Sequence, residues 1–180
     1  DADVPEFKIE RFEAHTRAFI KVQDGCNSFC SYCIIPYVRG RSRSRRLESI
    51  LDEVRGLVKN GFYEVVLTGI NIGDFDGAPT EGEKPVRLSE LTREVSKIPG
   101  VERLRISSID PDEVDDELIH VLQSSPNCCP SMHIVLQSGS NSVLKRMRRK
   151  YTVQQFFETV DRLKSALPDF TFTTDIIVGF

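Results

Sequence analysis

Three cysteines, Cys26, Cys30 and Cys33, are separated by three and then two residues within the segment QDGCNSFCSYCIIPYVRGRSRSRR. Thiolates are soft ligands that suit zinc ions and iron–sulfur clusters. A structural zinc site normally takes four protein ligands, and this segment offers three. A cubane cluster has four irons, so three thiolates would leave one iron open for a small molecule. The spacing therefore predicts a three-thiolate metal site, and Gly25 is expected to turn the backbone into it.

A second interpretation of the same cysteines is a zinc-stabilised RNA-binding module. In that case Cys128 or Cys129 would supply a fourth ligand, and the arginines would carry the function. The position of the cysteine segment directly after an apolar run, residues 18–22, favours the iron–sulfur interpretation instead.

Apolar residues recur with two different periods along the chain, and these periods alternate. Short β-branched runs predict strands, and stripes at helical spacing predict amphipathic helices. Strands are expected at residues 18–23, 64–69, 103–107, 132–137 and 172–178. Helices are expected at residues 47–58, 88–98, 114–122 and 153–167, the last opened by a capping box from Thr152 to Gln155. Strands that alternate with helical crossovers favour an α/β fold with a parallel sheet.

Five strands are too few for a closed eightfold barrel. Residues 1–17 are charged and lack periodicity, and we expect a linker from an upstream domain there. Residues 18–180 are expected to form the core domain. Its last strand ends at residue 178 with no helix to cover it, which predicts that the domain is incomplete at its C-terminus.

Small and polar residues follow each predicted strand. Parallel α/β folds bind their ligands at the carboxyl ends of the strands, where these residues gather. The rule selects as candidate cofactor-binding residues Thr68, Gly69, Asn71, Ser107, Ser108, Gln137, Ser138 and Asp175.

Charge is balanced overall but gathered locally. The chain has 24 basic and 27 acidic residues, so its net charge of −3 indicates no partner. Two basic runs border the mouth of the predicted site and are candidate RNA contacts. These candidates are Arg39, Arg41 and Arg43 in the first run and Arg148 and Arg149 in the second. No apolar run reaches membrane-spanning length, and five unevenly spaced cysteines suit a reducing cytoplasm.

The segment GCNSFCSYCIIPYVRGRSRSR, with Tyr32 just before its last cysteine, resembles the radical S-adenosylmethionine superfamily and, within it, the methylthiotransferases. That superfamily uses a partial barrel of six strand–helix units, so the resemblance implies a partial (β/α)6-type barrel that is truncated here after about five strands. The resemblance implies that the three cysteines are catalytic and hold a [4Fe–4S] cluster, whose open iron chelates S-adenosylmethionine. It also implies that Tyr32 packs on adenine, and that Ser107, Ser108 and Gln137 face the methionyl carboxylate and ribose. Thr68 and Gly69 stand where the superfamily often has Gly-Gly-Glu, and this chain has no Glu there.

The activity that the resemblance implies is methylthio transfer. A reduced cluster cleaves S-adenosylmethionine to a 5′-deoxyadenosyl radical, which takes a hydrogen from the substrate before a methylthio group is installed. The implied partners are a tRNA substrate and an electron donor such as flavodoxin or ferredoxin. A radical enzyme of other chemistry is an alternative. Full-length relatives add an N-terminal domain with a second [4Fe–4S] cluster and a C-terminal RNA-binding β-barrel, so we expect both outside these residues.

The segment LTGINIGDF resembles the group that acts on N6-threonylcarbamoyladenosine beside the tRNA anticodon. The group that acts on N6-isopentenyladenosine more often has Gly-Gln-Asn at this point. The segment CNSFCSYCIIPYVRG fits either tRNA group and fits the group that modifies a ribosomal protein less well. The resemblance therefore implies threonylcarbamoyladenosine as the substrate, with isopentenyladenosine as the alternative.

Overall fold

Five parallel strands, taken in chain order, form the sheet of this protein. The computed structural model describes residues 17–180. The strands are β1 (Arg17–Lys21), β4 (Glu64–Thr68), β5 (Arg103–Ile106), β6 (Ser131–His133) and β7 (Thr171–Thr173). β4 lies between β1 and β5, β6 pairs with β7, and parallel bridges at Leu104–Cys128 and Ile109–Ile134 join the two groups. This order confirms the predicted parallel α/β fold.

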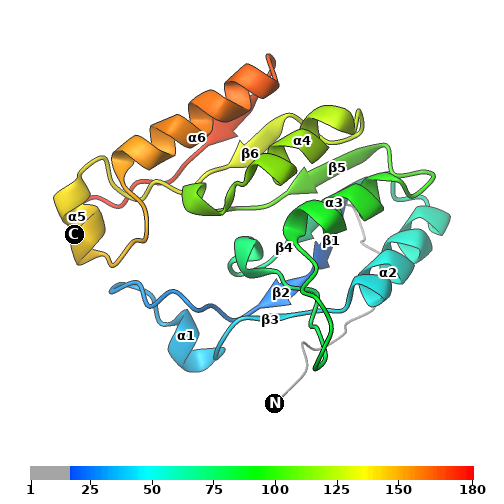
Figure 1. Ribbon diagram of the computed structural model, residues 1–180, viewed down its shortest axis with the longest axis horizontal. Helices are drawn as coiled ribbons and strands as arrows, with labels where there is room; N and C mark the ends of the chain where they lie inside the picture. The colour runs from blue at the N-terminus through cyan, green and yellow to red at the C-terminus, as the bar shows by residue number, and fades with distance from the viewer. Residues whose placement is uncertain (1–16) are drawn as a thin grey trace.

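Each connection between consecutive strands of this sheet contains one helix of nine or more residues. These helices are α2 (Leu47–Lys59), α3 (Leu88–Ser96), α4 (Asp116–Ser124) and α6 (Val153–Ala166). Figure 1 shows them in a row along the strands, in the order in which the sheet is built. The predicted linker, residues 1–17, lies outside the described residues except for Arg17. That residue belongs to β1, and its guanidinium lies 3.5 Å from the Glu64 carboxylate.

The core forms because each apolar stripe meets the sheet. In β1, buried Ala18 and Ile20 alternate with exposed Arg17 and Phe19, which is the period of a strand. In α2 the buried residues are Ile50, Leu51, Val54 and Leu57, which follow the period of a helix. The capping box that opens α6 is present, with the Gln155 backbone donating to Thr152 Oγ1 and the Thr152 backbone donating to Gln155 Oε1.

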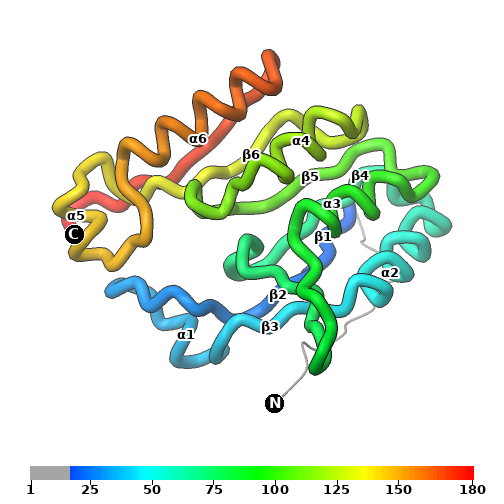
Figure 2. Tube along the Cα trace, viewed as in Figure 1, coloured from blue at the N-terminus to red at the C-terminus, as the bar shows by residue number. Residues whose placement is uncertain are grey.

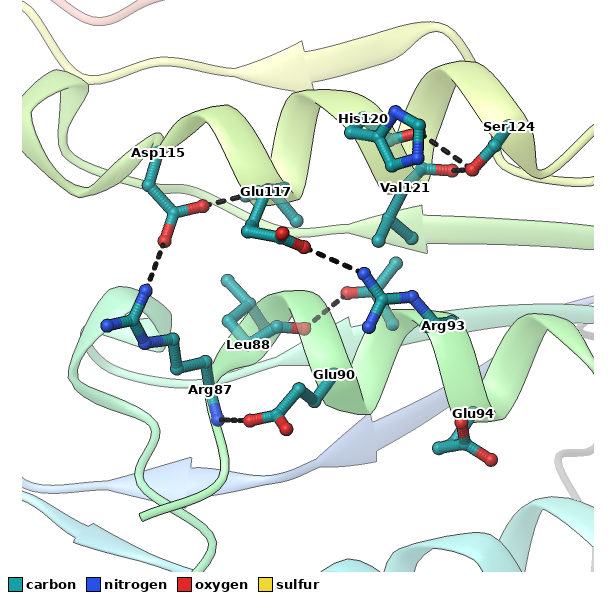
Figure 3. Close-up of polar contacts among 12 residues, drawn as sticks. Arg87, Leu88, Glu90, Arg93, Glu94, Asp115, Glu117, His120, Val121 and Ser124 are labelled. Carbon is teal, nitrogen blue, oxygen red and sulfur yellow. Dashed lines mark hydrogen bonds and ion pairs between the residues drawn. The ribbon is translucent and has the colours of Figure 1, made fainter. Parts of the chain in front are cut away.

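Ion pairs join the outer faces of α3 and α4. Arg93 donates to the carboxylate of Glu117 at 2.8 Å, and Arg87 lies 3.6 Å from Asp115 (Figure 3). Both pairs are exposed to solvent, so each stabilises the fold by less than about 1 kcal/mol. The buried stripes, and not these pairs, hold the helices in place.

Two predicted strands are shorter than expected. The strand predicted at 132–137 is regular only in β6, and the one predicted at 172–178 only in β7. Gln137 has a φ of +65°, which no regular strand allows. Beyond the regular part, the Thr174 hydroxyl accepts from the Leu136 backbone, and the Gln137 backbone donates to the Asp175 carbonyl. A side-chain hydrogen bond and isolated backbone hydrogen bonds thus replace the regular hydrogen-bond ladder of a strand pair.

Additional short elements were not expected from the sequence. They are α1 (Ile35–Val38), α5 (Asn141–Arg146), two turns of 3₁₀ helix (Ile72–Asp74 and Pro111–Glu113), and the antiparallel ribbon of β2 (Gln23–Asp24) with β3 (Arg43–Ser44). The helices α1 and α5 lie at the same end of the trace (Figure 2). Ser31, in the loop before α1, joins that loop to the C-terminal end of α5. Its backbone donates to the Met147 carbonyl, and its hydroxyl donates to the Arg146 carbonyl. In the described part of the chain, no helix is long and apolar enough to cross a membrane.

Gly25 begins the loop that carries the three cysteines. Its φ is +72°, and a Cβ built on it would lie 2.1 Å from the carbonyl oxygen of Arg41. A side chain here would meet both backbone strain and a backbone atom that cannot rotate away. The sequence-based expectation that Gly25 turns the chain into the loop is consistent with this geometry.

We expect Gly25→Ala to lower the free energy of unfolding by about 3 kcal/mol or more, because strain of ~1–2 kcal/mol adds to the clash with Arg41. Gly61→Ala is the matched control, since Gly61 has a φ of +87° and open space around its Cβ position. It should cost about 1 kcal/mol. Urea unfolding of both variants measures the difference, and equal losses would contradict the crowding at Gly25.

Candidate functional site

The fully buried side chain of Gln23 holds the base of the cysteine loop. Its Nε2 donates to the carbonyl oxygens of Asp24 and Gly25 and to the hydroxyl of Ser42, at 3.1, 2.9 and 2.8 Å. Its Oε1 accepts from the backbone of Asn71 at 3.0 Å. One amide therefore links both ends of the cysteine loop to the loop that follows β4.

The three cysteines line one cavity of about 320 Å³ at the carboxyl edge of the sheet. Cys26 and Cys30 are buried, Cys33 is half-buried, and all three are free thiols. The Cys26 sulfur accepts from the Ser28 backbone at 3.3 Å, and burial raises the pKa of this thiol above its ordinary value. The other lining residues are Ser28, Tyr32, Ile35, Ile70, Asn71, Asp110, Val135, Gln137 and Arg149.

Arg149 places a charge inside the cavity. Its side chain is only 8% exposed. The guanidinium pairs with the carboxylate of Asp110, donates to the Cys30 sulfur at 3.1 Å and donates to the Tyr151 hydroxyl at 3.0 Å. Burial alone would lower the pKa of Arg149. The neighbouring Asp110 carboxylate and other nearby groups raise it by more than burial lowers it, so the net shift is upward and the guanidinium stays charged. The guanidinium therefore gives the Cys30 sulfur a charged hydrogen-bond donor inside the cavity.

The carboxyl group of Glu113 does not line the cavity but holds Asn71, which does. The Oε1 of Glu113 accepts from the side-chain amide of Asn71 at 2.8 Å, and its Oε2 accepts from the Asp110 backbone at 3.4 Å. Burial, with a contribution from Asp110, raises the pKa of Glu113 to about 7. Gly73 makes room for it, because a Cβ there would lie 2.1 Å from the Glu113 carboxylate.

The cavity brings together six of the residues that the sequence predicted for the cysteine and cofactor sites: Cys26, Cys30, Cys33, Tyr32, Asn71 and Gln137. Burial raises the pKa of Tyr32 to about 12, so its hydroxyl stays neutral near pH 7.

The other predicted cofactor residues lie outside the cavity lining. Thr68 ends β4, and Gly69 packs against the Gln23 side chain. The Ser107 hydroxyl is buried without a partner among the described residues, while Ser108 is exposed. Ser138 accepts from the backbone of Ser140. The Asp175 side chain is 79% exposed and lies 3.5 Å from His133. Their predicted contacts with a cofactor remain predictions.

The first basic run divides between surface and interior. Arg39 pairs with Asp24 at 3.2 Å, and the Arg41 guanidinium lies over the ring of Phe29. Arg43 is half-buried in β3, while Arg45 is buried against Glu53 at 2.6 Å. Arg39 and Arg41 therefore remain accessible to an RNA, and Arg45 serves the fold.

The second basic run divides in the same way. Arg148 is exposed, as an RNA contact requires. Arg149 is not, because its guanidinium faces Cys30 and Asp110 inside the cavity. The position of Arg149 does not fit the predicted contact with RNA; the structure places it beside the cysteines instead.

Sequence reasoning missed several residues that build the site. Asp110 and Glu113 were not among the predicted site residues, although they follow β5 at the carboxyl edge of the sheet, which is a usable signal. No sequence signal pointed to Gln23 or Ser28 other than their closeness to the cysteines. Cys128 is one of the residues that the zinc interpretation needs. It pairs with Leu104 near the start of β5, at the sheet edge away from the cysteine loop.

The residues present fit an iron–sulfur cluster with a small ligand. Three free thiols face one cavity, and the hydroxyl of Ser28, which lines it, is buried without a partner among the described residues. In the described part of the chain, no three Cys, His, Asp or Glu side chains converge on a single-ion site. Thiolates that bind separate irons of a cubane need no such convergence.

The fold and the site define a parallel α/β domain with a three-cysteine loop at its carboxyl edge. The family model of the radical SAM superfamily matches residues 20–180. The chain belongs to the radical SAM superfamily.

Within the superfamily, the chain is similar in sequence to proteins named as tRNA-modifying enzymes. The chain is 56% identical, over all of its 180 residues, to the threonylcarbamoyladenosine tRNA methylthiotransferase MtaB of Chlamydia pneumoniae, and covers 41% of that protein. It is 44% identical over 96% of its length to the tRNA-2-methylthio-N(6)-dimethylallyladenosine synthase of Acetivibrio thermocellus, and covers 35% of it. The chain thus spans well under half the length of these curated relatives.

A solved structure shares the fold at lower identity. The radical S-adenosylmethionine methyltransferase TsrM of Kitasatospora setae superposes with a TM-score of 0.65 at 21% identity. The match covers 89% of this chain and 29% of TsrM. The partial-barrel architecture is therefore the fold of this chain.

We expect Arg149→Met to lower the free energy of unfolding by about 3 kcal/mol, because it leaves the buried carboxylate of Asp110 without its partner. Adding Asp110→Asn should restore most of the loss. Arg148→Met is the control and should change stability by less than about 0.5 kcal/mol, since Arg148 is exposed. Urea unfolding of the single and double variants gives the coupling, and additive effects would contradict a buried ion pair.

We expect Glu113 to make stability depend on pH. Its pKa in the folded state, about 7, exceeds its ordinary value of 4.5, so the folded state keeps a proton that the unfolded chain has released. Stability should therefore fall as pH rises between these values, by on the order of 3 kcal/mol from this group. Glu113→Gln should flatten that decline in urea unfolding across the same interval. A decline of unchanged size would show that Glu113 ionises normally.

Proposed function

We propose that this chain is the part of a tRNA methylthiotransferase that holds a [4Fe–4S] cluster and S-adenosylmethionine. The observation that carries the proposal is the set of three free thiols on one cavity, beside a buried arginine, at the carboxyl edge of a radical SAM fold. Relatives that match nearly the whole chain are named as tRNA methylthiotransferases, which supports transfer of a methylthio group to tRNA.

Cys26, Cys30 and Cys33 would hold the cluster, leaving one iron for the cofactor. When bound, the cluster supplies the single electron that cleaves S-adenosylmethionine. Tyr32 and Gln137 line the same cavity and would contact the cofactor, although they lie in segments far apart in the sequence.

The chain's own residues prepare this site for the cofactor. Arg149 keeps its charge next to the Cys30 sulfur and donates a hydrogen bond to it. Glu113 and Gln23 hold the side chain and the backbone of Asn71, which fixes one wall of the cavity. Burial of Cys26 and Cys30 keeps water from the reactive end of the site.

The zinc-stabilised module is less well supported. A structural zinc ion needs four ligands around one atom. The cysteines proposed as a fourth ligand lie at the other edge of the sheet, where the Cys129 backbone donates to the Leu104 carbonyl. Separate thiol positions around a cavity suit a cubane better.

For the substrate, we propose N6-threonylcarbamoyladenosine in tRNA. The relative from Chlamydia pneumoniae carries that name at 56% identity. Two further relatives named for threonylcarbamoyladenosine are 45% identical to the chain, and relatives named for dimethylallyladenosine reach 44%. Sequence identity therefore favours threonylcarbamoyladenosine only through the relative from Chlamydia pneumoniae. The segment LTGINIGDF adds independent support.

The remaining parts of the activity follow from the same proposal. Reduction of the cluster requires an electron donor such as flavodoxin or ferredoxin, and we place a second [4Fe–4S] cluster in an N-terminal domain. A tRNA substrate and reduced thiols both suit the cytoplasm.

The test is anaerobic reconstitution with iron and sulfide, followed by EPR of the reduced protein with and without S-adenosylmethionine. We expect a [4Fe–4S] signal that shifts when the cofactor binds the open iron. Cys30→Ala should abolish the signal, because the cluster loses one of three ligands. Cys128→Ala is the control and should retain it, since Cys128 lies in the core away from the cavity. A colourless protein that holds one zinc ion and ignores the cofactor would refute the proposal.

A further inference from the structure

The segment of α1 exposes large apolar side chains at the rim of the cavity. Ile34, Tyr37 and Val38 are 66%, 71% and 64% exposed, whereas Ile35 beside them lines the cavity. Apolar groups of this size, gathered within five residues, indicate an interaction site more than a solvated surface.

Three side chains of this region form what we name the aromatic platform: Phe29, Tyr37 and Arg41. The rings of Phe29 and Tyr37 meet edge to face, with centroids 5.6 Å apart. The guanidinium carbon of Arg41 lies 4.9 Å from the Phe29 centroid, which is a cation–π contact. These contacts hold Tyr37 in place while most of its surface stays open to solvent.

The surroundings of the aromatic platform are positively charged. Residues 25–47 contain five arginines and no Asp or Glu. Arg45 and Arg46 pair with Glu53 and Glu83, so the charge near the aromatic platform comes from the other three, Arg39, Arg41 and Arg43. The nearby carboxylate of Asp24 is shared by Arg39 and Lys21, at 3.2 and 3.1 Å, so it neutralises one positive charge and not both. Among the described residues no carboxylate pairs with Arg41, which leaves its N–H groups available to an anion. An exposed aromatic ring beside arginines fits a polyanion that carries flat rings.

We propose that the aromatic platform stacks on an unpaired RNA base next to the nucleotide that reaches the cavity. This inference rests on the proposed function, which makes RNA the substrate, and it names the surface that holds the RNA. A nucleotide that enters a buried site must leave its stack, and the adjacent base loses a neighbour. Tyr37 would replace that neighbour, and Arg41 would pair with a phosphate.

Stacking predicts a specific dependence on the ring. Tyr37→Ala should weaken the binding of a labelled RNA hairpin with an unpaired loop by about tenfold, and Tyr37→Phe should retain the affinity because the ring remains. Binding of a fully paired RNA duplex, whose bases are not available, should not change in either variant. Arg41→Gln should weaken both RNAs and lower the slope of affinity against salt by about one.

The matched control is Tyr63→Ala. Tyr63 is another exposed aromatic residue, 52% accessible, but it precedes β4 at the opposite edge of the sheet, so its removal should leave hairpin affinity unchanged. Fluorescence anisotropy of the reconstituted protein measures the affinities, and iron content with absorbance confirms equal cluster loading in every variant.

The outcomes separate this inference from the function on which it rests. If the parent binds the hairpin and Tyr37→Ala binds it equally well, the aromatic platform is refuted and the RNA substrate stands. If Tyr37→Ala instead changes only self-association in analytical ultracentrifugation, the surface contacts protein and the proposal fails. If the cluster-loaded parent binds neither RNA, the aromatic platform is refuted, because this surface then holds no RNA; the proposed function is judged separately by the EPR response to S-adenosylmethionine.

Discussion

The buried amide of Gln23 is the interaction on which the rest of the site depends. Its four hydrogen bonds join the start of the cysteine loop, the end of that loop and the loop after β4. A satisfied bond of this kind contributes only about 1 kcal/mol, but a buried amide left without partners costs more than that. Gly69 belongs to the same arrangement, because a Cβ there would lie 2.8 Å from the Gln23 oxygen. The cysteine loop is therefore anchored to the sheet at its base, and its sulfurs are held relative to the strands.

The parallel sheet explains why the partners of this loop come from distant parts of the chain. All five strands end at the same edge, so the loops that follow them meet there. Asp110 arrives after β5, Gln137 after β6, and Arg149 after α5. Charge is introduced into this apolar region as a pair, since the Asp110 carboxylate accompanies the Arg149 guanidinium. That pairing keeps a cation next to the Cys30 sulfur at a tolerable desolvation cost.

Arginines of the two basic runs have different roles in this structure. Arg41 stacks on Phe29 at the surface, Arg45 lies buried against Glu53, and Arg149 faces the cavity, although each belongs to a basic run. The environment that surrounds each guanidinium decides whether it binds an external anion, stabilises the fold or acts on a thiol. The rim of the cavity thus combines an accessible aromatic and cationic surface with a closed, paired interior.

Local chemistry is what the sequence by itself determined. The apolar stripe of α2 and the capping box of Thr152 depend on neighbours a few residues away, and both are found as predicted. The close spacing of Cys26, Cys30 and Cys33 is also local, and it brings all three to one cavity. The parallel order of the strands also followed, because strand–helix alternation permits few topologies.

Only the tertiary structure decided the rest. Arg149 and Cys30 lie 119 residues apart and meet because α5 packs against the cysteine loop, which no local pattern reports. The shortened β6 and β7 depend on the left-handed backbone of Gln137 and on a side-chain bond from Thr174. A charge, a buried amide or a strand end takes its role from the groups packed around it, and these come together only when the sheet is assembled.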